Sequence, residues 1–378
     1  MVAIKGINLL PPTVTTTEAL TLYKKVAIIK SKIGRLNAEL AHSIVDSHLL
    51  QLLALNESVQ STRIEGTQVT FADMIDDDDK KNKRTAVAEV DNYREALSFG
   101  IELIKNGNPI STRLIQQIHT KLMSGNTRGT TSDRGEYRKI QNFIGPDKKI
   151  EHAAYIPVGA NEISEYMANL EYYINGEHHR TFEGINVSSN EIILDETTDP
   201  LIKAAIMHAQ FESIHPFLDG NGRVGRMMIV LSTMLDGLVE KPVFLVSEEL
   251  EKERLRYYNF LNGVRGDTPN WFGWIDFFLE ASNRMTDNLL IKLISITNLS
   301  HEGLKKIDIK RSNQQQAWFL TFGQPWIDAK YLSERLKVTP TTSRSILNEL
   351  EKLGLLESDV SRKRNKVYVN YGLLRLLQ

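Results

Sequence analysis

The chain has 378 residues, of which 41% are hydrophobic and 25% charged, as expected of a globular protein with two or three domains. Its formal net charge of −1 gives no overall field that would attract nucleic acid or an anionic membrane, so contact with nucleic acid would need a local basic patch. The chain contains no cysteine, which excludes disulfides, cysteine–zinc sites and thiol catalysis. Because it also has no secretory or membrane-spanning apolar run, we expect a cytoplasmic protein without membrane contact.

The first hundred residues predict an N-terminal helical region. Residues 1–16 are rich in proline and threonine and predict an extended arm. Helical periodicity then predicts helices over residues 17–40, 44–65 and 84–100. Thr17 is a candidate cap for the first helix, and Gly66 is placed to end the second. The charge run at residues 76–81 predicts a solvated helix or loop rather than a cation site.

The next stretch mixes helices with short extended segments. We expect a helix over residues 111–124, capped by Ser111 or Thr112, and another over residues 160–176. Residues 141–145 and 154–157, joined by a turn at Pro146-Asp147, predict a β-hairpin. Residues 177–198 are polar and predict irregular structure. His178-His179 in this segment lack carboxylates at ligand spacing, so we expect them to be exposed rather than metal-bound.

A twelve-residue segment at 215–226, with the sequence HPFLDGNGRVGR, joins two further predicted helices. Asp199-Pro200 is a helix start, and apolar periodicity continues to Ser213. After the segment, the periodicity resumes and ends at Gly237. The segment is therefore a helix–loop–helix connection, with Gly220-Asn221-Gly222 at the start of the second helix.

The residue types in this segment suit the chemistry of phosphates. A helix N-terminus with glycines offers unpaired N–H groups and the positive end of the helix dipole to an anion. Arg223 and Arg226 lie on one helical face and can bind further phosphate oxygens. Asp219 is a hard oxygen ligand for Mg²⁺, and His215 can take a proton near neutral pH. The set predicts a phosphoryl or nucleotidyl transfer site; a glycine-rich turn with solvated arginines is the alternative.

The segment also resembles, position by position, the signature of the Fic family (filamentation induced by cAMP), most of whose members are protein adenylyltransferases. The resemblance implies a mainly α fold, with a helical Fic core, a β-hairpin flap at residues 141–157 and the N-terminal helical region. It implies transfer of AMP from ATP to a Ser, Thr or Tyr hydroxyl of a target protein docked on the flap by β-augmentation. The nucleotide-binding residues implied are Asp219, Gly220, Asn221, Gly222, Arg223, Val224, Gly225, Arg226, Ile144, Gly145, Tyr257 and Tyr258.

In this interpretation His215 is the catalytic base that takes the hydroxyl proton. Asp219 holds Mg²⁺ against the α- and β-phosphates, and the Asn221 side chain could add a donor to the phosphates. Arg223 and Arg226 hold the outer phosphates.

Glu65 stands in the last turn of the second predicted helix, where a carboxylate faces the negative end of the dipole. The spacing of Ser61, Glu65 and Gly66 resembles the inhibitory motif that some Fic proteins carry N-terminal to the core, in which the glutamate pairs with the second arginine, here Arg226. A plain surface glutamate is the alternative. A further alternative is that Glu65 orients a water that hydrolyses AMP from a modified protein.

The C-terminal third changes in character after a helix over residues 248–261, which carries Tyr257-Tyr258, and an apolar core helix at residues 271–279. Residues 283–310 predict a connecting helix. Residues 311–378 resemble a winged helix, with helices over 328–337 and 340–353, strands over 355–360 and 367–369, and a basic tip at 361–366. A DNA-binding regulator with a nucleotide-sensing core is therefore an alternative function, and winged helices also serve as dimer elements, which leaves a homodimer open. The predicted domains are residues 1–100, 101–282, 283–310 and 311–378.

Overall fold

The computed structural model describes residues 3–42, 47–71, 73–74, 84–125, 133–145, 149–183, 187–358 and 366–377. The charge run at residues 76–81, the Pro146-Asp147 turn and residues 361–365 of the basic tip lie outside the described residues. The chain divides into two compact units: a first unit of Met1–Gly34 and Glu57–Thr286, and a second unit of Arg35–Asn56 and Asp287–Gln378. The domain boundaries given above stay predictions.

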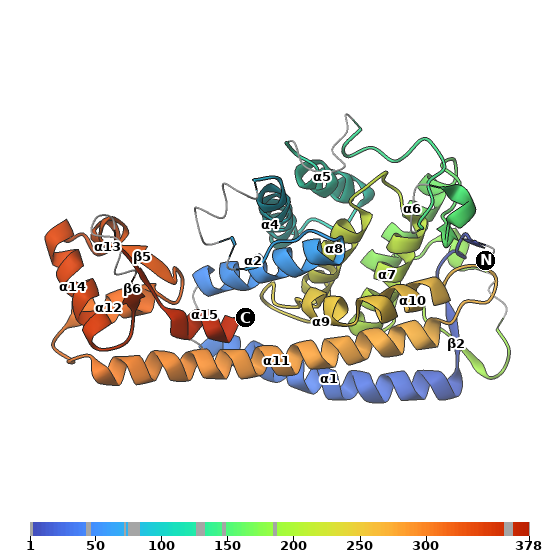
Figure 1. Ribbon diagram of the computed structural model, residues 1–378. Helices are drawn as coiled ribbons and strands as arrows, with labels where there is room; N and C mark the ends of the chain where they lie inside the picture. Colours follow the sequence, from blue (N-terminus) through green and yellow to red (C-terminus); the bar gives the residue numbers. More distant parts are fainter. Residues whose placement is uncertain are drawn as a thin grey trace. The chain divides into compact units, whose positions relative to one another are not determined.

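The fold is mainly helical, as predicted (Figure 1). Three helices contribute residues to both units, namely α1 Thr16–His42, α2 Ser47–Ile64 and α11 Trp271–Lys306. The remaining α-helices of the first unit are α4 Arg84–Lys105, α5 Thr112–Leu122, α6 Ile163–Asn175, α7 Pro200–Ile214, α8 Asn221–Leu235, α9 Ser247–Lys252 and α10 Arg254–Gly263. Two short 3₁₀ turns, Ile150–His152 and Arg180–Phe182, lie between them.

Side chains at the helix starts explain where these helices begin. Ser111 caps α5 by accepting a hydrogen bond from the Leu114 N–H, and Asp199 caps α7 ahead of Pro200, both as predicted. The predicted cap Thr17 is wrong, because α1 begins at Thr16 and Thr15 holds its first turn. Thr15 Oγ1 accepts from the Glu18 N–H, and Glu18 Oε2 accepts from the Thr15 N–H at 2.8 Å, which is a capping box.

Helix α7 is the core of the first unit. Each of its residues from 201 to 214 is buried, and a helix buried on every side belongs in the middle of a fold. Helix α11 packs against it, since Trp274 Nε1 donates a hydrogen bond to the Ala205 carbonyl at 2.8 Å. Trp274, Phe277 and Phe278 have at most 1% of their surface exposed, so the prediction that residues 271–279 form core is confirmed. This rigid packing fixes the end of α7, where the 215–226 segment begins.

The β-structure of the first unit differs from the prediction. β1 (Ile4–Lys5) pairs parallel with β3 (Tyr155–Ile156), and β2 (Thr13–Thr15) pairs antiparallel with β4 (Glu191–Ile193). The prediction that residues 177–198 are wholly irregular is therefore wrong, because β4 lies among them. Strand β4 was missed because its partner stands far away in the sequence, and no hairpin turn joins the two.

Among the described residues, the predicted flap hairpin shows one antiparallel bridge, between Ile144 and Tyr155. Beside it, Gln141 Nε2 donates to the Pro157 carbonyl at 2.9 Å, and Asn142 Oδ1 accepts from the Phe143 N–H. One edge of β3 is covered by the chain's own β1, so that edge is not free for another strand.

Two helix predictions also need correction. The helix predicted over residues 248–261 is interrupted at Glu253, which separates α9 from α10. Conversely, the apolar helix at residues 271–279 and the predicted connecting helix form one continuous helix, α11. Periodicity alone does not register a one-residue break or a join, because the apolar positions keep their spacing across it.

The second unit contains a three-stranded antiparallel sheet of order β5–β7–β6. Helices α13 and α14 begin at the caps Asp328 and Thr339, and Pro340 is the first residue of α14, as predicted. Helices α12 and α15 and strand β5 were not predicted. The winged-helix assignment, and DNA binding or dimerisation through it, stay predictions. The elements are α12 Ser312–Leu320, β5 Trp326–Asp328, α13 Ala329–Leu336, α14 Pro340–Lys352, β6 Glu357–Ser358, β7 Val367–Val369 and α15 Tyr371–Leu377.

Within the described residues, no helix is both long enough and apolar enough to cross a membrane.

Candidate active site

The 215–226 segment forms a tight loop between α7 and α8. Helix α7 ends at Ile214 and is followed by His215, which has a left-handed backbone (φ 50°, ψ 59°). Gly220, with φ 79°, directly precedes α8. The Asn221 side chain closes this loop, because its Oδ1 accepts from the Phe217 N–H at 2.9 Å and its Nδ2 donates to the Phe217 carbonyl at 2.8 Å. Asn221 is 2% exposed. Its side chain therefore holds the loop together, and its role as a donor to phosphates stays a prediction.

The backbone at the start of α8 presents N–H groups that the helix itself does not use. The first hydrogen bond of the α8 ladder is donated by the Val224 N–H to the Gly220 carbonyl at 3.0 Å. The N–H groups of Asn221, Gly222 and Arg223 precede that bond and have no acceptor within the helix. Together with the helix dipole, they favour a negatively charged ligand such as a phosphate.

His215 is held neutral beside this turn. Burial lowers the pKa of its imidazole to about 4, and the Arg265 cation acts in the same direction. Its Nδ1 lies 3.4 Å from the Glu212 carbonyl oxygen. Because a carbonyl oxygen only accepts, Nδ1 carries the proton in this contact, which leaves Nε2 with a lone pair. His215 can therefore act as a base at neutral pH.

Arg138 holds the backbone around His215, a role that we did not predict. Its Nε donates to the His215 carbonyl at 2.9 Å and its Nη2 to the Val158 carbonyl at 2.5 Å. Its own N–H donates to the Pro216 carbonyl at 2.9 Å. The side chain is buried, and the cation lies at the carbonyl end of α7, where positive charge is favourable.

Arg265 was also missed, and it holds the last turn of α7 from another direction. Its Nε donates to Ser213 Oγ at 3.1 Å and its Nη2 to the Glu212 carbonyl at 3.2 Å. Its guanidinium lies 3.9 Å from the centre of the Tyr155 ring, so the strand β3 is tied to the same point.

Arg226 lies one turn into α8 and points at the end of α2. It is 1% exposed, and it donates from Nε to Ser61 Oγ at 2.8 Å and from Nη2 to the Ser61 carbonyl at 2.9 Å. Its Nη2 also lies 2.6 Å from Glu65 Oε1. Burial acts to lower the pKa of Arg226 and to raise that of Glu65, but their attraction outweighs it, so the pKa of Arg226 is raised and that of Glu65 lowered. The pair is therefore ionic at neutral pH.

The Glu65 carboxylate lies directly over the first turn of α8. A Cβ added to Gly222 would stand 2.2 Å from Glu65 Oε1, so no side chain fits at position 222 while Glu65 is in place. The carboxylate thus covers the same turn whose N–H groups favour an anion.

Asp219 and Arg223 lie at the other side of the loop. Asp219 Oδ1 accepts from the Gly220 N–H at 2.5 Å and lies 3.3 Å from Arg223 Nη2. The Asp219 side chain is 42% exposed, so a cation can reach it. Among the described residues, no group of three or more His, Asp or Glu side chains could hold a metal. A Mg²⁺ ion would therefore need phosphate and water oxygens in addition to Asp219, which is the usual coordination of Mg²⁺ at nucleotides.

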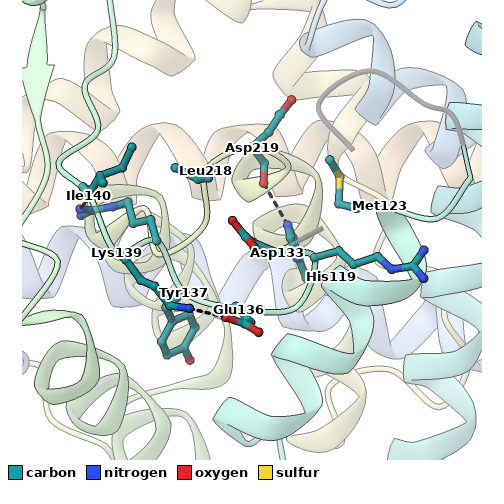
Figure 2. Close-up of a pocket in the computed structure, with 11 residues that line it drawn as sticks. His119, Met123, Asp133, Glu136, Tyr137, Lys139, Ile140, Leu218 and Asp219 are labelled. Atoms are coloured by element: carbon teal, nitrogen blue, oxygen red, sulfur yellow. Dashed lines mark hydrogen bonds and ion pairs between the residues drawn. The ribbon is translucent and has the colours of Figure 1, made fainter. Parts of the chain in front are cut away.

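A pocket of about 120 Å³ lies beside Asp219 (Figure 2). Its wall includes His119 of α5, Met123 directly after that helix, residues of the segment 133–140, and Leu218 and Asp219 of the loop. Burial lowers the pKa of His119 to about 4, so this imidazole is neutral at physiological pH.

The remaining predicted site residues differ in their burial and in how near they lie to the loop. Tyr257 has no exposed surface, and its hydroxyl bonds His208 Nε2 at 2.8 Å. Val224 is likewise fully buried, and nucleotide binding by these two residues stays a prediction. Gly225 packs against α7, since a Cβ there would lie 2.6 Å from Glu212 Oε1. Tyr258 does reach the site, because its hydroxyl donates to the Ile64 carbonyl at 3.3 Å, next to Glu65. Ile144 and Gly145 lie at the bridge to Tyr155.

Comparisons with known proteins agree with the geometry. The model of the Fic/DOC family matches residues 109–232, and the model of the Fic/DOC family N-terminal region matches residues 23–102. A protein named Protein adenylyltransferase Fic from Drosophila erecta is 27% identical over 152 residues, and that of Drosophila melanogaster is 29% identical over 127 residues. These alignments cover 40% and 34% of this chain but only 24% and 20% of the relatives, so the chain spans about a quarter of their length or less.

A solved structure supports the fold over nearly the whole chain. A Fic family protein from Desulfovibrio desulfuricans G20 aligns with a TM-score of 0.55 at 20% identity, covering 96% of this chain and 98% of that one. The two matched regions, the helix–loop–helix segment at 215–226 and this shared fold agree, and the chain belongs to the Fic/DOC family.

Proposed function

We propose that this protein is an adenylyltransferase that moves AMP from ATP to a Ser, Thr or Tyr hydroxyl of a target protein, and that Glu65 inhibits it. The single observation that carries the proposal is the juxtaposition, in one loop, of a neutral His215, the open N–H groups of α8 and a buried Arg226. The names of the Drosophila relatives supply the choice of AMP as the group transferred.

In the proposed reaction, His215 Nε2 takes the proton of the acceptor hydroxyl. The hydroxyl oxygen forms a bond to the α-phosphorus of ATP, the bond from that phosphorus to the bridging oxygen breaks, and pyrophosphate leaves with its electron pair. The N–H groups at the start of α8 stabilise charge on the phosphates. Asp219 would hold Mg²⁺, which when bound neutralises phosphate charge. Because β1 covers one edge of β3, we propose that an extended target segment would bind along the backbone of residues 141–145.

The proposed inhibition follows from what Arg226 and Gly222 contact. Arg226 can bind an outer phosphate of ATP only if it gives up its contacts with Ser61 and Glu65. The charged Glu65 carboxylate lies over Gly222 and would repel the same phosphates. ATP would then bind with its α-phosphorus out of line for attack.

The same position of Glu65 supports a second candidate, which is hydrolysis of AMP from a modified target. A charged carboxylate beside the phosphate-binding turn could orient a water toward the α-phosphorus and take its proton as it attacks. His215, protonated on Nε2 for this direction of the reaction, would give that proton to the leaving hydroxyl oxygen. Wild-type protein mixed with an adenylylated target should then release AMP, and Glu65→Gly should not. Retention of all label by the wild type would remove this candidate.

The test of transfer is incubation of lysate with α-labelled ATP and Mg²⁺. We expect Glu65→Gly to label proteins at least ten-fold faster than wild type, and Glu65→Gly combined with His215→Ala to return to background. A matched control is Glu177→Gly, because Glu177 is an exposed carboxylate just past the glycine that ends α6. Absence of labelled protein with Glu65→Gly would contradict the proposed activity, and equal labelling by wild type and Glu65→Gly would contradict the inhibition alone.

A further inference from the structure

His119 lies where α5, the 133–135 segment and the loop after α7 meet. Its ring stacks on Phe217 at 3.8 Å between centroids and 4° between planes. Its Nδ1 accepts a hydrogen bond from the Gly135 N–H at 2.8 Å, and its Nε2 lies 3.1 Å from the Asp219 carbonyl oxygen (Figure 2). The residue is 5% exposed. Both ring nitrogens and one ring face are therefore engaged.

These partners fix the tautomer of the imidazole. A backbone N–H can only donate, so Nδ1 must carry the lone pair. The proton of the neutral ring then resides on Nε2 and is donated to the Asp219 carbonyl. The hydrogen bond has a direction, and it holds the peptide plane between Asp219 and Gly220.

That peptide plane matters because the carboxylate of Asp219 projects from the same residue. Gly220 needs φ 79° for the turn, and a Cβ there would come within 3.5 Å of the His119 ring and 3.1 Å of Met123 Sδ. The His119 ring and the turn are thus fitted to each other. A rotation of the 219–220 peptide would carry the Gly220 N–H away from Asp219 Oδ1, so the carboxylate would lose one of the two contacts that orient it, the other being with Arg223.

We propose that His119 is a positioning residue, which orients Asp219 for its metal ion through the Nε2–H bond to the Asp219 carbonyl. The inference rests on the proposed function in one respect, namely that Asp219 is the metal ligand. Groups that orient a metal ligand without touching the metal affect metal affinity by roughly 10–100-fold when removed. A buried histidine that only fills space would leave metal affinity unchanged once the fold is intact.

The experiment measures metal binding apart from turnover, in the Glu65→Gly background. Mn²⁺ binding is followed by electron paramagnetic resonance in the presence of an ATP analogue with a methylene group between the α- and β-phosphorus. His119→Phe keeps a ring for the stack on Phe217 but removes both nitrogens. His119→Gln restores a donor, and His178→Phe makes the same change at an exposed histidine outside the site.

We expect His119→Phe to weaken Mn²⁺ binding about ten-fold. His119→Gln should recover part of this loss, and His178→Phe should match the parent. In the transfer assay, the Mg²⁺ concentration for half-maximal rate should rise about ten-fold in His119→Phe, with much of the rate returning at saturating Mg²⁺. Melting temperatures confirm that each variant is folded.

A folded His119→Phe that binds Mn²⁺ within two-fold of its parent overturns the inference. So does a loss of analogue affinity that is equal with and without metal. If His119→Phe does not fold, the tautomer of His119 is measured in the parent from the ¹⁵N chemical shifts of the ring. A proton on Nε2 supports the inference, and a proton on Nδ1 overturns it. A parent that neither binds Mn²⁺ with the analogue nor transfers label refutes the proposed function itself, whereas a transferring parent with unaffected variants refutes only the role of His119.

Discussion

Arg226 is a buried cation that contacts one charged side chain, Glu65, and the uncharged oxygens of Ser61. Loss of the charged contact and loss of an uncharged contact should have different effects. Glu65 supplies the counter-charge, while Ser61 supplies a hydroxyl and a carbonyl, both uncharged, which accept hydrogen bonds from Arg226. Removing the carboxylate frees Arg226 and also removes the negative charge above Gly222. Removing the hydroxyl leaves the charge in place but orphans the Nε donor.

Ser61→Ala should therefore have a graded effect. Leaving a buried donor unsatisfied costs roughly 1–3 kcal/mol, so the melting temperature should fall by a few degrees. The ion pair with Glu65 remains, so label transfer should rise above wild type but stay well below that of Glu65→Gly. Ser58→Ala, at a buried serine one turn earlier in α2, is the control for packing. Transfer and melting temperature both equal to wild type would show that the Ser61 hydroxyl has no part in holding Arg226.

At this scale the sequence predicted the residues that act through a local pattern. His215, Asp219, the Gly-Asn-Gly turn and the two arginines lie in one segment, so their chemistry could be inferred together. His119, Arg138 and Arg265 could not be found this way, because each binds backbone groups of a distant segment, such as the His215 carbonyl 77 positions from Arg138. Backbone carbonyls have no sequence signature. The loop-closing role of Asn221 was missed for the same reason, since its partner is the backbone of Phe217.

Among the elements, α2 is anchored by polar contacts near its middle as well as at its end. Glu57 on this helix is 2% exposed, its Oε2 accepts from the Ser247 N–H at 3.3 Å, and its Oε1 contacts the Ser247 hydroxyl. The Tyr93 hydroxyl lies 3.5 Å from Glu57 Oε1. The segment of α2 that carries Ser61 is thus fixed to α9 one turn earlier.

This anchor makes the stability of the protein sensitive to pH. Burial raises the pKa of Glu57 from 4.5 to about 7, so between these values the folded state keeps a proton that the unfolded chain has lost. Stability from this group is complete below pH 4.5 and is lost as the pH rises to about 7. Glu57→Gln, which cannot ionise, should match wild type near pH 5 and exceed it at pH 8 by on the order of 2–3 kcal/mol.

Melting temperatures of the two proteins at pH 5 and pH 8 test this. Glu212 is shifted in the same direction, but it is present in both proteins and cancels in the comparison. A variant that is less stable than wild type by the same amount at both pH values would contradict the shifted ionisation of Glu57.

The helices were predicted better than the strands because helices are local. Apolar spacing and caps identified α5, α7, α8 and α14 to within a residue or two. The pairing of Ile4 with Tyr155 joins segments about 150 positions apart, and no sequence pattern in either segment predicts its partner. Such pairings depend on the packing of the helices between them.

For the molecule as a whole, the ion pair predicts how ligands stabilise the fold. A ligand at 100 times its Kd stabilises the folded state by about 2.7 kcal/mol, so a difference in affinity appears as a difference in melting temperature. ATP with Mg²⁺ should therefore raise the melting temperature of Glu65→Gly more than that of wild type. AMP lacks the outer phosphates that Arg226 would bind, so it should raise both equally. An ATP shift that is the same in both proteins would indicate that Glu65 does not compete with the outer phosphates.

The closed loop at Asn221 also affects the chemical stability of that residue. An Asn-Gly sequence is prone to deamidation, in which the glycine nitrogen attacks the asparagine side-chain carbonyl and the side-chain nitrogen leaves as ammonia, giving a cyclic imide. Here the amide is pinned to Phe217 by two hydrogen bonds and Gly222 is held in the first turn of α8, so the attack geometry is blocked while the chain stays folded. Chain that has unfolded loses this protection. Asn221 would then become isoaspartate or aspartate, and either product adds a negative charge to the turn proposed to bind phosphates.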